Sequence, residues 1–386
     1  MNITVLADEN IPGVEHYLGS RVTVRYVNGR ALRKAQLRGA DALLVRSVTR
    51  VDEMLLAGSS IQYVGTTTSG FDHIDQNYLS RCGIAFAHAP GSNANSVVEY
   101  VLTAIAAVGQ KLENILNGGR VGIVGYGVIG RSLAARLKVL GVPYSVFDPW
   151  LDQNAIPSGA GLSAVLDCDI VSLHAELTHH QPWPSMHLLA DAELKCMRTG
   201  SLLINASRGP VINNKALLAL LQTRDDLSVV LDVWEGEPDI KPDLLERVAL
   251  GSAHIAGYSL DGKIQATRIV SEALCNHFAI AQPTWESPLA DPPAVNAPAN
   301  LSDAELVRHL LQSRYDIFKD DELLRQTVLH NKSSASPEQG FDLLRKQYRV
   351  RRELAGAAVE GTALSHPQLQ LIRALGCVYE RKASLQ

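Results

Sequence analysis

The sequence Gly125-Tyr126-Gly127-Val128-Ile129-Gly130 follows a short apolar run at 121–124 and precedes a helix-like run that reaches Leu140. Glycines at this spacing allow a tight turn, a close approach of the backbone to a phosphate, and close packing of the helix on the strand. The N-terminus of such a helix binds a pyrophosphate through its free N–H groups. A second predicted strand ends at Asp148, 18 residues after the last glycine, where a carboxylate accepts hydrogen bonds from a ribose and repels a 2′-phosphate. The segment therefore predicts a dinucleotide-binding βαβ unit that prefers NAD to NADP.

Short apolar runs alternate with helix-like or loop segments along much of the chain. In the first ninety residues these runs are ITVL, VTVRYV, ALLV, QYVGT and IAFA, and beyond Asp148 they are DIVSLHAEL, SLLINAS, SVVLDVW and RVALGSAHIAG. Such alternation is typical of parallel sheets covered by helices. We therefore expect an α/β fold whose nucleotide domain is a Rossmann-type, doubly wound parallel sheet.

Charged residues gather where the later apolar runs end. Arg208 follows SLLINAS, Asp232 and Glu237 lie in LDVWEGEP, and His254 lies in AHIAGYS. Ligands of open α/β sheets bind beyond the carboxyl ends of the strands. Oxidising a 2-hydroxy acid with a nicotinamide cofactor needs a cation for the carboxylate, a base, and an acid that stabilises the protonated base. Taken singly, the same residues are also consistent with a solvated surface arginine, a turn acid and an interior histidine.

The order of GYGVIG, Asp148, NASRGPVIN, LDVWEGEP and HIAGYS resembles the D-isomer-specific 2-hydroxyacid dehydrogenase family over roughly residues 1–280. The resemblance implies that Arg208 binds the carboxylate and the C2 oxygen, that Glu237 is the acidic partner, and that His254 accepts the proton in oxidation and donates it in reduction. It also implies NAD as cofactor and a flavodoxin-like substrate domain. The implied cofactor contacts are Gly125, Tyr126, Gly127, Val128, Ile129, Gly130, Asp148, Ala175, Ala206, Ser207, Asp232 and Gly257.

One loop departs from the family pattern. Family members commonly have a His-Thr-Pro-Leu type of loop after the fourth strand of the nucleotide domain, whereas this chain has His174-Ala175-Glu176-Leu177. A threonine side-chain contact is not available at Ala175, which leaves the backbone to contact the cofactor. Histidines 179, 180 and 187 follow. We expect no metal site there, because nothing indicates acids or thiols converging on them.

Several motifs, namely LADENIP, LLVRSVTRV, VGTTTSGFDHID, APGSNANSVVEYV and HIAGYSLDGK, together with the extra C-terminal segment, are similar to a narrower group of the family whose substrate carries a phosphate. A second anion site is then required. Arg46 and Ser47 follow one apolar run, and the hydroxyl groups of Thr66–Ser69 follow the next, which suits a phosphate. Thr68 and Tyr258 are further expected substrate contacts. The alternative is a Ser/Thr turn that caps its own backbone.

The predicted domains are discontinuous. Residues 1–94 and 258–287 form the substrate domain, residues 95–257 the NAD-binding domain, and residues 288–386 a proline- and alanine-rich linker followed by a small α+β domain that the resemblance assigns to dimerisation. The segment at 93–110 predicts a long helix that opens with a capping box of Ser96 and Glu99. The basic run at 343–353 is interpreted as a solvated helix face, with delivery of positive charge to a partner's phosphate site as the alternative.

Composition limits the remaining possibilities. The chain has 386 residues, 46% of them hydrophobic, and a net charge of −4, so it has no general basic field for nucleic acid or an acidic membrane. The start lacks a signal-peptide pattern, and no uncharged stretch is long enough to span a bilayer. The five cysteines are scattered and form no CxxC pair, which favours reduced structural thiols and a cytoplasmic location.

We therefore expect a homodimeric enzyme that oxidises a phosphorylated 2-hydroxy acid at C2 to the 2-oxo acid with NAD. Two alternatives remain open. One is another dehydrogenase of the same fold, acting on 3-phosphoglycerate or glycerate. The other is a nucleotide-sensing binding protein that kept the fold and lost turnover. The set of Arg208, Glu237 and His254 counts against the sensor, and the C-terminal segment counts against the simpler dehydrogenases.

Overall fold

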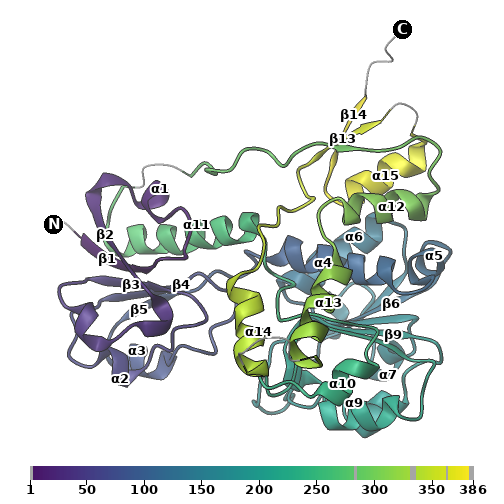
Figure 1. Cartoon of the computed structure of the whole chain (residues 1–386), viewed down its shortest axis with the longest axis horizontal. Helices are drawn as coiled ribbons and strands as arrows, with labels where there is room; N and C mark the ends of the chain where they lie inside the picture. Colours follow the sequence, from purple (N-terminus) through teal and green to yellow (C-terminus); the bar gives the residue numbers. More distant parts are fainter. Residues whose placement is uncertain (1–2, 282–284, 331–335, 362–363, 382–386) are drawn as a thin grey trace. The chain divides into compact units, whose positions relative to one another are not determined.

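The computed structural model describes residues 3–281, 285–330, 336–361 and 364–381 (Figure 1). The chain divides into two compact units. Unit 1 is Met1–Asn93 with Ser259–Ala290, and unit 2 is Ala94–Tyr258 with Asp291–Gln386. Within the described ranges, none of the helices has both the length and the apolar character needed to cross a membrane.

Unit 1 is built on a parallel sheet of five strands in the order β2-β1-β3-β4-β5. This order is that of flavodoxin-like folds, as the sequence analysis predicts. The long helix α11 returns to the sheet from late in the chain, and the hydroxyl of Tyr63 on β4 donates to the carbonyl of Val270 on α11 at 2.9 Å. The strands are β1 (Ile3–Asp8), β2 (Val22–Val27), β3 (Ala42–Val45), β4 (Tyr63–Thr66) and β5 (Ala85–Ala87), and the α-helices are α1 (Val14–Leu18), α2 (Glu53–Leu56), α3 (Gln76–Arg81) and α11 (Leu260–His277).

Unit 2 contains a six-stranded parallel sheet in the order β11-β10-β9-β8-β6-β7. The direction of winding changes between β6 and β8, which is where doubly wound sheets bind their ligands. All residues of β6, β8 and β9 are buried, because helices cover both faces: α4 and α6 lie on one side and α7, α9 and α10 on the other (Figure 1). The strands are β6 (Val121–Val124), β7 (Tyr144–Phe147), β8 (Ile170–Leu173), β9 (Leu202–Asn205), β10 (Ser228–Leu231) and β11 (Leu250–Gly251). The helices over these strands are α4 (Ala94–Ala107), α5 (Lys111–Leu116), α6 (Val128–Val139), α7 (Leu162–Leu166), α8 (Asp191–Lys195), α9 (Asn214–Leu221) and α10 (Pro242–Arg247). The predicted α/β fold class is confirmed.

The predicted capping box at Ser96 and Glu99 is wrong. Helix α4 begins at Ala94, so both residues lie inside it. The Ser96 hydroxyl donates to Glu353 at 2.8 Å, and the Glu99 carboxylate accepts the N–H groups of Leu354 and Ala355 at 2.8 and 3.0 Å. These side chains hold the C-terminal segment against α4 instead of capping the helix.

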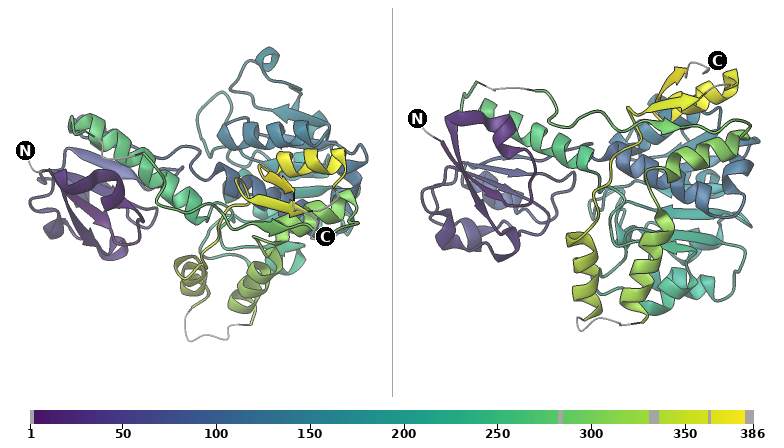
Figure 2. Two further views of the ribbon diagram at one scale, coloured as in Figure 1. Left: turned by 90° about the horizontal axis from the view of Figure 1, so that it is seen from above. Right: turned by 45° about the horizontal axis from the view of Figure 1, so that its top comes forward.

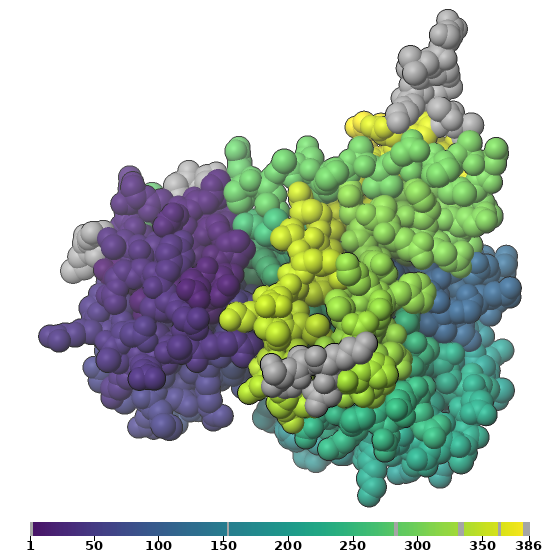
Figure 3. All heavy atoms as spheres, in the orientation of Figure 1, coloured from purple at the N-terminus to yellow at the C-terminus, as the bar shows by residue number. Residues whose placement is uncertain are grey.

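The C-terminal segment packs within unit 2. Helix α12 contacts α4, α15 contacts α6, and α13 and α14 run side by side (Figure 2). Residues 300–330 and 336–350 form part of the face of unit 2 seen in Figure 3. The elements are β12 (Val295–Asn296), α12 (Asp303–Gln312), α13 (Ile317–Val328), α14 (Pro337–Lys346), β13 (Ala358–Gly361), α15 (His366–Ala374) and β14 (Val378–Arg381), with the three strands parallel in the order β12-β13-β14.

The basic run at 343–353 is not a uniformly solvated face, contrary to the interpretation from sequence. Arg349 donates to Asp320 at 2.5 Å. Arg351 is only 3% exposed, donates to the carbonyl of Ala256 at 2.7 Å, and lies 4.6 Å from the ring centre of Tyr315. These arginines tie the C-terminal segment to the body of unit 2, because a buried guanidinium is stable only where acceptors and aromatic faces receive it.

Candidate active site

The glycine loop after β6 is fitted closely to its own surroundings. Gly125 has φ of +93°, and a Cβ atom there would lie 2.6 Å from the backbone nitrogen of Ala175, which follows β8. A Cβ atom at Gly130 would lie 2.1 Å from the carbonyl oxygen of Gly125. Glycine at these two positions is therefore required by the packing of loop, strand and helix, whether or not a ligand is bound.

Gly127 differs from the other two glycines because it faces open space. A Cβ atom there would meet no atom of the described residues within 4 Å. Gly127 is the N-cap of α6, and no side chain caps the helix. The neighbouring Val128 is half exposed although it is apolar. Free N–H groups at the start of a twelve-residue helix, with room above them, fit a pyrophosphate.

Asp148 lies beside this loop. It follows β7, and its Oδ2 accepts the N–H of Tyr126 at 2.8 Å while its Oδ1 accepts the N–H of Trp150 at 3.1 Å. These bonds place the carboxylate against the glycine loop, where the ribose of a dinucleotide would lie. The donor set and the open space at Gly127 together fit NAD.

Two further predicted cofactor contacts follow β9. Ala206 and Ser207 are buried, and Ser207 is held by Asn205, whose Oδ1 accepts both the N–H and the hydroxyl of Ser207 at 3.1 and 2.8 Å. Ala175 and Gly257 lie in loops that follow β8 and β11. All of these residues belong to unit 2, and their cofactor contacts remain predictions.

His254 and Glu237 form a close pair. Their Nδ1 and Oε1 atoms are 2.5 Å apart, and the second carboxylate oxygen of Glu237 accepts the N–H of Trp234 at 3.1 Å. Burial alone would raise the pKa of Glu237, but the charge of His254 and hydrogen bonds from His254 and Trp234 outweigh it, so the pKa is lowered. Glu237 is therefore an ionised acceptor for His254. His254 has φ of 55°, which is rare for a non-glycine residue and marks a loop held by its surroundings.

Asp232 holds that loop. Its carboxylate accepts the Ser252 hydroxyl at 2.6 Å and the N–H groups of Ile255 and Ala256 at 2.8 and 2.9 Å, and the backbone carbonyl of Asp232 accepts the N–H of His254 at 2.7 Å. The side chain is almost completely buried. Sequence reasoning missed this supporting role. The expected cofactor contact of Asp232 stays a prediction.

Arg208 precedes the short 3-10 helix Gly209–Val211. One terminal nitrogen of its guanidinium donates to the carbonyl of Ser207 at 2.9 Å, and its own carbonyl accepts Asn205 at 3.0 Å. A Cβ atom on Gly209 would lie 2.0 Å from the backbone of Trp234, so the loops after β9 and β10 are in close contact. The structure thus brings the Arg208 loop against the segment that leads to Glu237.

Unit 1 contains the predicted phosphate-binding residues at the ends of neighbouring strands. Arg46 follows β3, and its guanidinium lies 4.0 Å from the buried carboxylate of Asp8 at the end of β1. Ser47 follows it in an exposed turn. After β4, Thr68 forms a hydrogen bond with the hydroxyl of Thr66 at 2.7 Å and donates to the carbonyl of Gly70 at 2.6 Å. The Thr68 hydroxyl is thus engaged with its own loop, as the Ser/Thr-turn alternative describes, and its substrate contact stays a prediction.

Two of the histidines after β8 contact polar side chains. His187 lies 2.6 Å from Glu235, and His174 lies 2.9 Å from the Ser172 hydroxyl. Burial lowers the pKa of His174 to about 4, so this residue is neutral. Over the residues for which the structure gives positions, no group of three or more His, Cys, Asp or Glu side chains is arranged to hold a metal ion.

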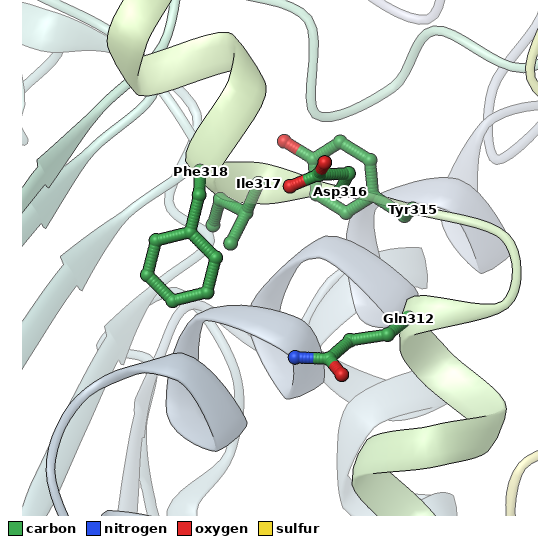
Figure 4. Close-up of a pocket in the computed structure, with 5 residues that line it drawn as sticks. All are labelled: Gln312, Tyr315, Asp316, Ile317 and Phe318. Carbon is green, nitrogen blue, oxygen red and sulfur yellow. The ribbon is translucent and has the colours of Figure 1, made fainter.

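A pocket of about 270 Å³ opens at the turn between α12 and α13 (Figure 4). None of the predicted site residues lines it, and we assign it no catalytic role. Its lining residues are Gln312, Tyr315, Asp316, Ile317 and Phe318.

Comparisons with known proteins agree with this geometry. Residues 104–259 match the family model described as D-isomer specific 2-hydroxyacid dehydrogenase, NAD binding domain, and residues 289–376 match a domain of unknown function (DUF3410). Erythronate-4-phosphate dehydrogenase of Cellvibrio japonicus is 43% identical over 376 residues, which cover 96% of this chain and 98% of the relative. The enzyme of the same name from Marinobacter nauticus is 42% identical over 380 residues, with the same coverage of both chains.

Solved structures share the fold. NAD⁺-bound 3-phosphoglycerate dehydrogenase of Entamoeba histolytica matches with a TM-score of 0.61 and 19% identity, over 72% of this chain and 96% of that one. D-lactate dehydrogenase of Aquifex aeolicus, solved with NAD and lactic acid, matches with a TM-score of 0.59 and 20% identity, over 72% and 95% of the two chains.

The fold, the glycine loop and these matches show that the chain belongs to the D-isomer specific 2-hydroxyacid dehydrogenase family. The similarity extends beyond the shared domains to almost the full length of the curated relatives. Within the family the chain therefore belongs with the erythronate-4-phosphate dehydrogenases.

Proposed function

We propose that this enzyme oxidises 4-phospho-D-erythronate at C2 to (R)-3-hydroxy-2-oxo-4-phosphobutanoate with NAD⁺, in pyridoxal 5′-phosphate (vitamin B6) biosynthesis. The observation that supports an active dehydrogenase most strongly is the His254–Glu237 pair at 2.5 Å, in the same unit as Arg208 and the glycine loop. The substrate is supported by the similarity to erythronate-4-phosphate dehydrogenases.

The pair supports an assignment of the histidine nitrogen that acts on the substrate. Ionised Glu237 accepts the Nδ1–H of His254, so Nε2 carries the lone pair in the neutral ring. In the proposed reaction Nε2 takes the proton of the C2 hydroxyl. Glu237 then stabilises the imidazolium, because an opposite charge at hydrogen-bond distance favours the protonated form.

Arg208 is assigned to the substrate carboxylate and the C2 oxygen, since a guanidinium offers paired donors that match a carboxylate. The N-terminus of α6 at Gly127 and the Asp148 carboxylate are assigned to NAD. Bound NAD⁺ accepts the hydride that leaves C2. The Asp232 carboxylate acts indirectly, by holding the backbone that carries His254.

Arg46, Ser47, Thr68 and Tyr258 are assigned to substrate binding. We assign residues 1–94 and 258–287 to the substrate domain, 95–257 to the NAD-binding domain, and 288–386 to a domain that forms a homodimer. A cytoplasmic location is proposed as well, because the scattered cysteines suit a reducing compartment.

The test is a substrate panel. Purified protein with NAD⁺ is incubated with 4-phosphoerythronate, erythronate, 3-phosphoglycerate and glycerate, and NADH is followed by absorbance. We expect the highest kcat/KM for 4-phosphoerythronate. A higher kcat/KM for 3-phosphoglycerate would transfer the assignment to that substrate, and NAD binding without any turnover would support the sensor alternative.

A further inference from the structure

One arginine of the C-terminal segment lies beside the catalytic loop. Arg345 is on α14, and its Cζ is 5.8 Å from the ring centre of Tyr258, four residues after His254. The Nε atom of Arg345 is buried and has no hydrogen-bond partner among the described residues. A buried N–H without an acceptor is costly, so this donor is available to an anionic ligand.

The position of Arg345 is well supported by packing. A Cβ atom at Gly340 would lie 2.3 Å from a methyl carbon of Thr327, so α14 lies tightly on α13. Phe341 is buried in the same hydrophobic cluster as Trp234. The ring of Tyr348 packs edge-on against Tyr258, with ring centres 5.8 Å apart. Helix α14 and its C-terminal extension therefore hold Arg345 near the loops of Glu237 and His254.

The charge of Arg345 interacts with Glu237 of the His254–Glu237 pair. Burial would lower the pKa of its guanidinium, but Tyr258 and Glu237 outweigh this effect and raise the pKa, so the group is a permanent cation. Asp342, on the same helix, also acts on it. Arg345 is in turn one of the cations that lower the pKa of Glu237. Neighbouring Arg349 donates to Asp320, and Arg351 donates to the carbonyl of Ala256 through one terminal nitrogen, whereas its Nε and Nη1 have no partner among the described residues.

We propose that Arg345, together with the Tyr258 hydroxyl, binds the phosphate of the substrate, so that α14 of the same chain contributes to the active site. This inference rests on the proposed function. A phosphate dianion accepts several hydrogen bonds, and a forked guanidinium with an unused N–H beside a phenol supplies donors in the required geometry. Arg208 is occupied by the carboxylate at the other end of the substrate.

The experiment compares phosphorylated and unphosphorylated substrates in three variants of the full-length enzyme. Arg345→Ala removes the contact, Arg345→Lys keeps the charge without the fork, and Lys346→Ala is the matched control, because Lys346 is the exposed neighbour on the same helix. We expect Arg345→Ala to lower kcat/KM for 4-phosphoerythronate roughly ten- to hundredfold more than it lowers kcat/KM for erythronate. Arg345→Lys should lie between Arg345→Ala and wild type, and Lys346→Ala should match wild type. Equal losses on the two substrates, or no loss on the phosphorylated one, would overturn the inference.

A binding measurement separates this inference from the proposed function. If the wild-type enzyme does not oxidise 4-phosphoerythronate, the proposed function fails, and Arg345 is tested by calorimetric titration of the NAD-loaded enzyme with inorganic phosphate. We expect phosphate to bind wild type and Lys346→Ala equally and Arg345→Ala at least roughly tenfold more weakly. Equal affinities, or no phosphate binding by wild type, contradict the inference. Thermal unfolding of each variant verifies that it is folded. If Arg345→Ala does not fold, the phosphate titration compares Arg345→Lys with wild type.

Discussion

The substitution Asp232→Asn tests whether the carboxylate builds the catalytic loop. The best-placed asparagine keeps its amide oxygen at the Oδ1 position, where it accepts Ser252 and Ile255. Its NH₂ group then faces the N–H of Ala256, which the native Oδ2 accepts at 2.9 Å. Losing one charge-assisted hydrogen bond and leaving a buried N–H unsatisfied costs about 3 kcal/mol or more. For a domain of this size that corresponds to a fall in Tm of roughly 6–12 °C.

The assay is thermal unfolding without NAD, together with kcat and the NAD dissociation constant. Asp239→Asn is the matched control: its side chain is exposed, and its nearest cation, Lys241, is 3.9 Å away, so we expect a change within about 0.5 kcal/mol. Asp232→Asn should also lower kcat, because the backbone around His254 loses its support. If Asp232→Asn has the Tm of the wild type and only its affinity for NAD falls, the carboxylate acts on the cofactor and does not support the loop.

Substituting Asp148→Ala should weaken NAD binding and reduce discrimination against NADP, because the ribose acceptor and the repulsion of a 2′-phosphate disappear together; equal affinity of wild type for both cofactors would contradict this placement. His254→Ala should lower kcat by at least about a hundredfold while the Kd for NAD is unchanged, and Arg208→Lys should also be severely impaired because a point charge does not reproduce two-pronged carboxylate binding; steady-state kinetics with near wild-type activity in either variant would exclude the assigned role. Burial and the nearby Glu353 raise the pKa of Glu99 from 4.5 to about 7. The folded state therefore holds the proton more tightly than the unfolded chain, and this contribution to stability is full below pH 4.5 and lost as pH rises through about 7. In Glu99→Gln, denaturant unfolding across this range should show a smaller fall in stability than wild type, and an unchanged profile would rule out Glu99 as its source.

Local sequence was sufficient for the features that depend on neighbouring residues. The spacing of Gly125, Gly127 and Gly130 predicts a strand, a turn and a helix, and the structure has β6 and α6 on the two sides of this loop. The contact between Gly130 and the carbonyl oxygen of Gly125 is local, whereas Gly125 is constrained by Ala175 after β8. The runs that end before Arg208 and His254 predict parallel strands, and the carboxyl ends of such strands meet at one edge of a sheet. The strands are confirmed, and the shared site of the two residues stays a prediction.

Features that depend on distant contacts needed the tertiary structure. Ser96 and Glu99 match the local pattern of a helix cap, but α4 begins before them. Their side chains form hydrogen bonds with residues 353–355 instead. Likewise, the sequence alone gives no sign that Asp232 holds the His254 loop.

The position of Arg345 beside Tyr258 results from the packing of α14 on α13. Periodicity and spacing report which faces of a helix are apolar, but they do not report which distant loop those faces cover. That choice depends on complementary packing of whole elements, so the active-site contribution of α14 is visible only in the folded chain.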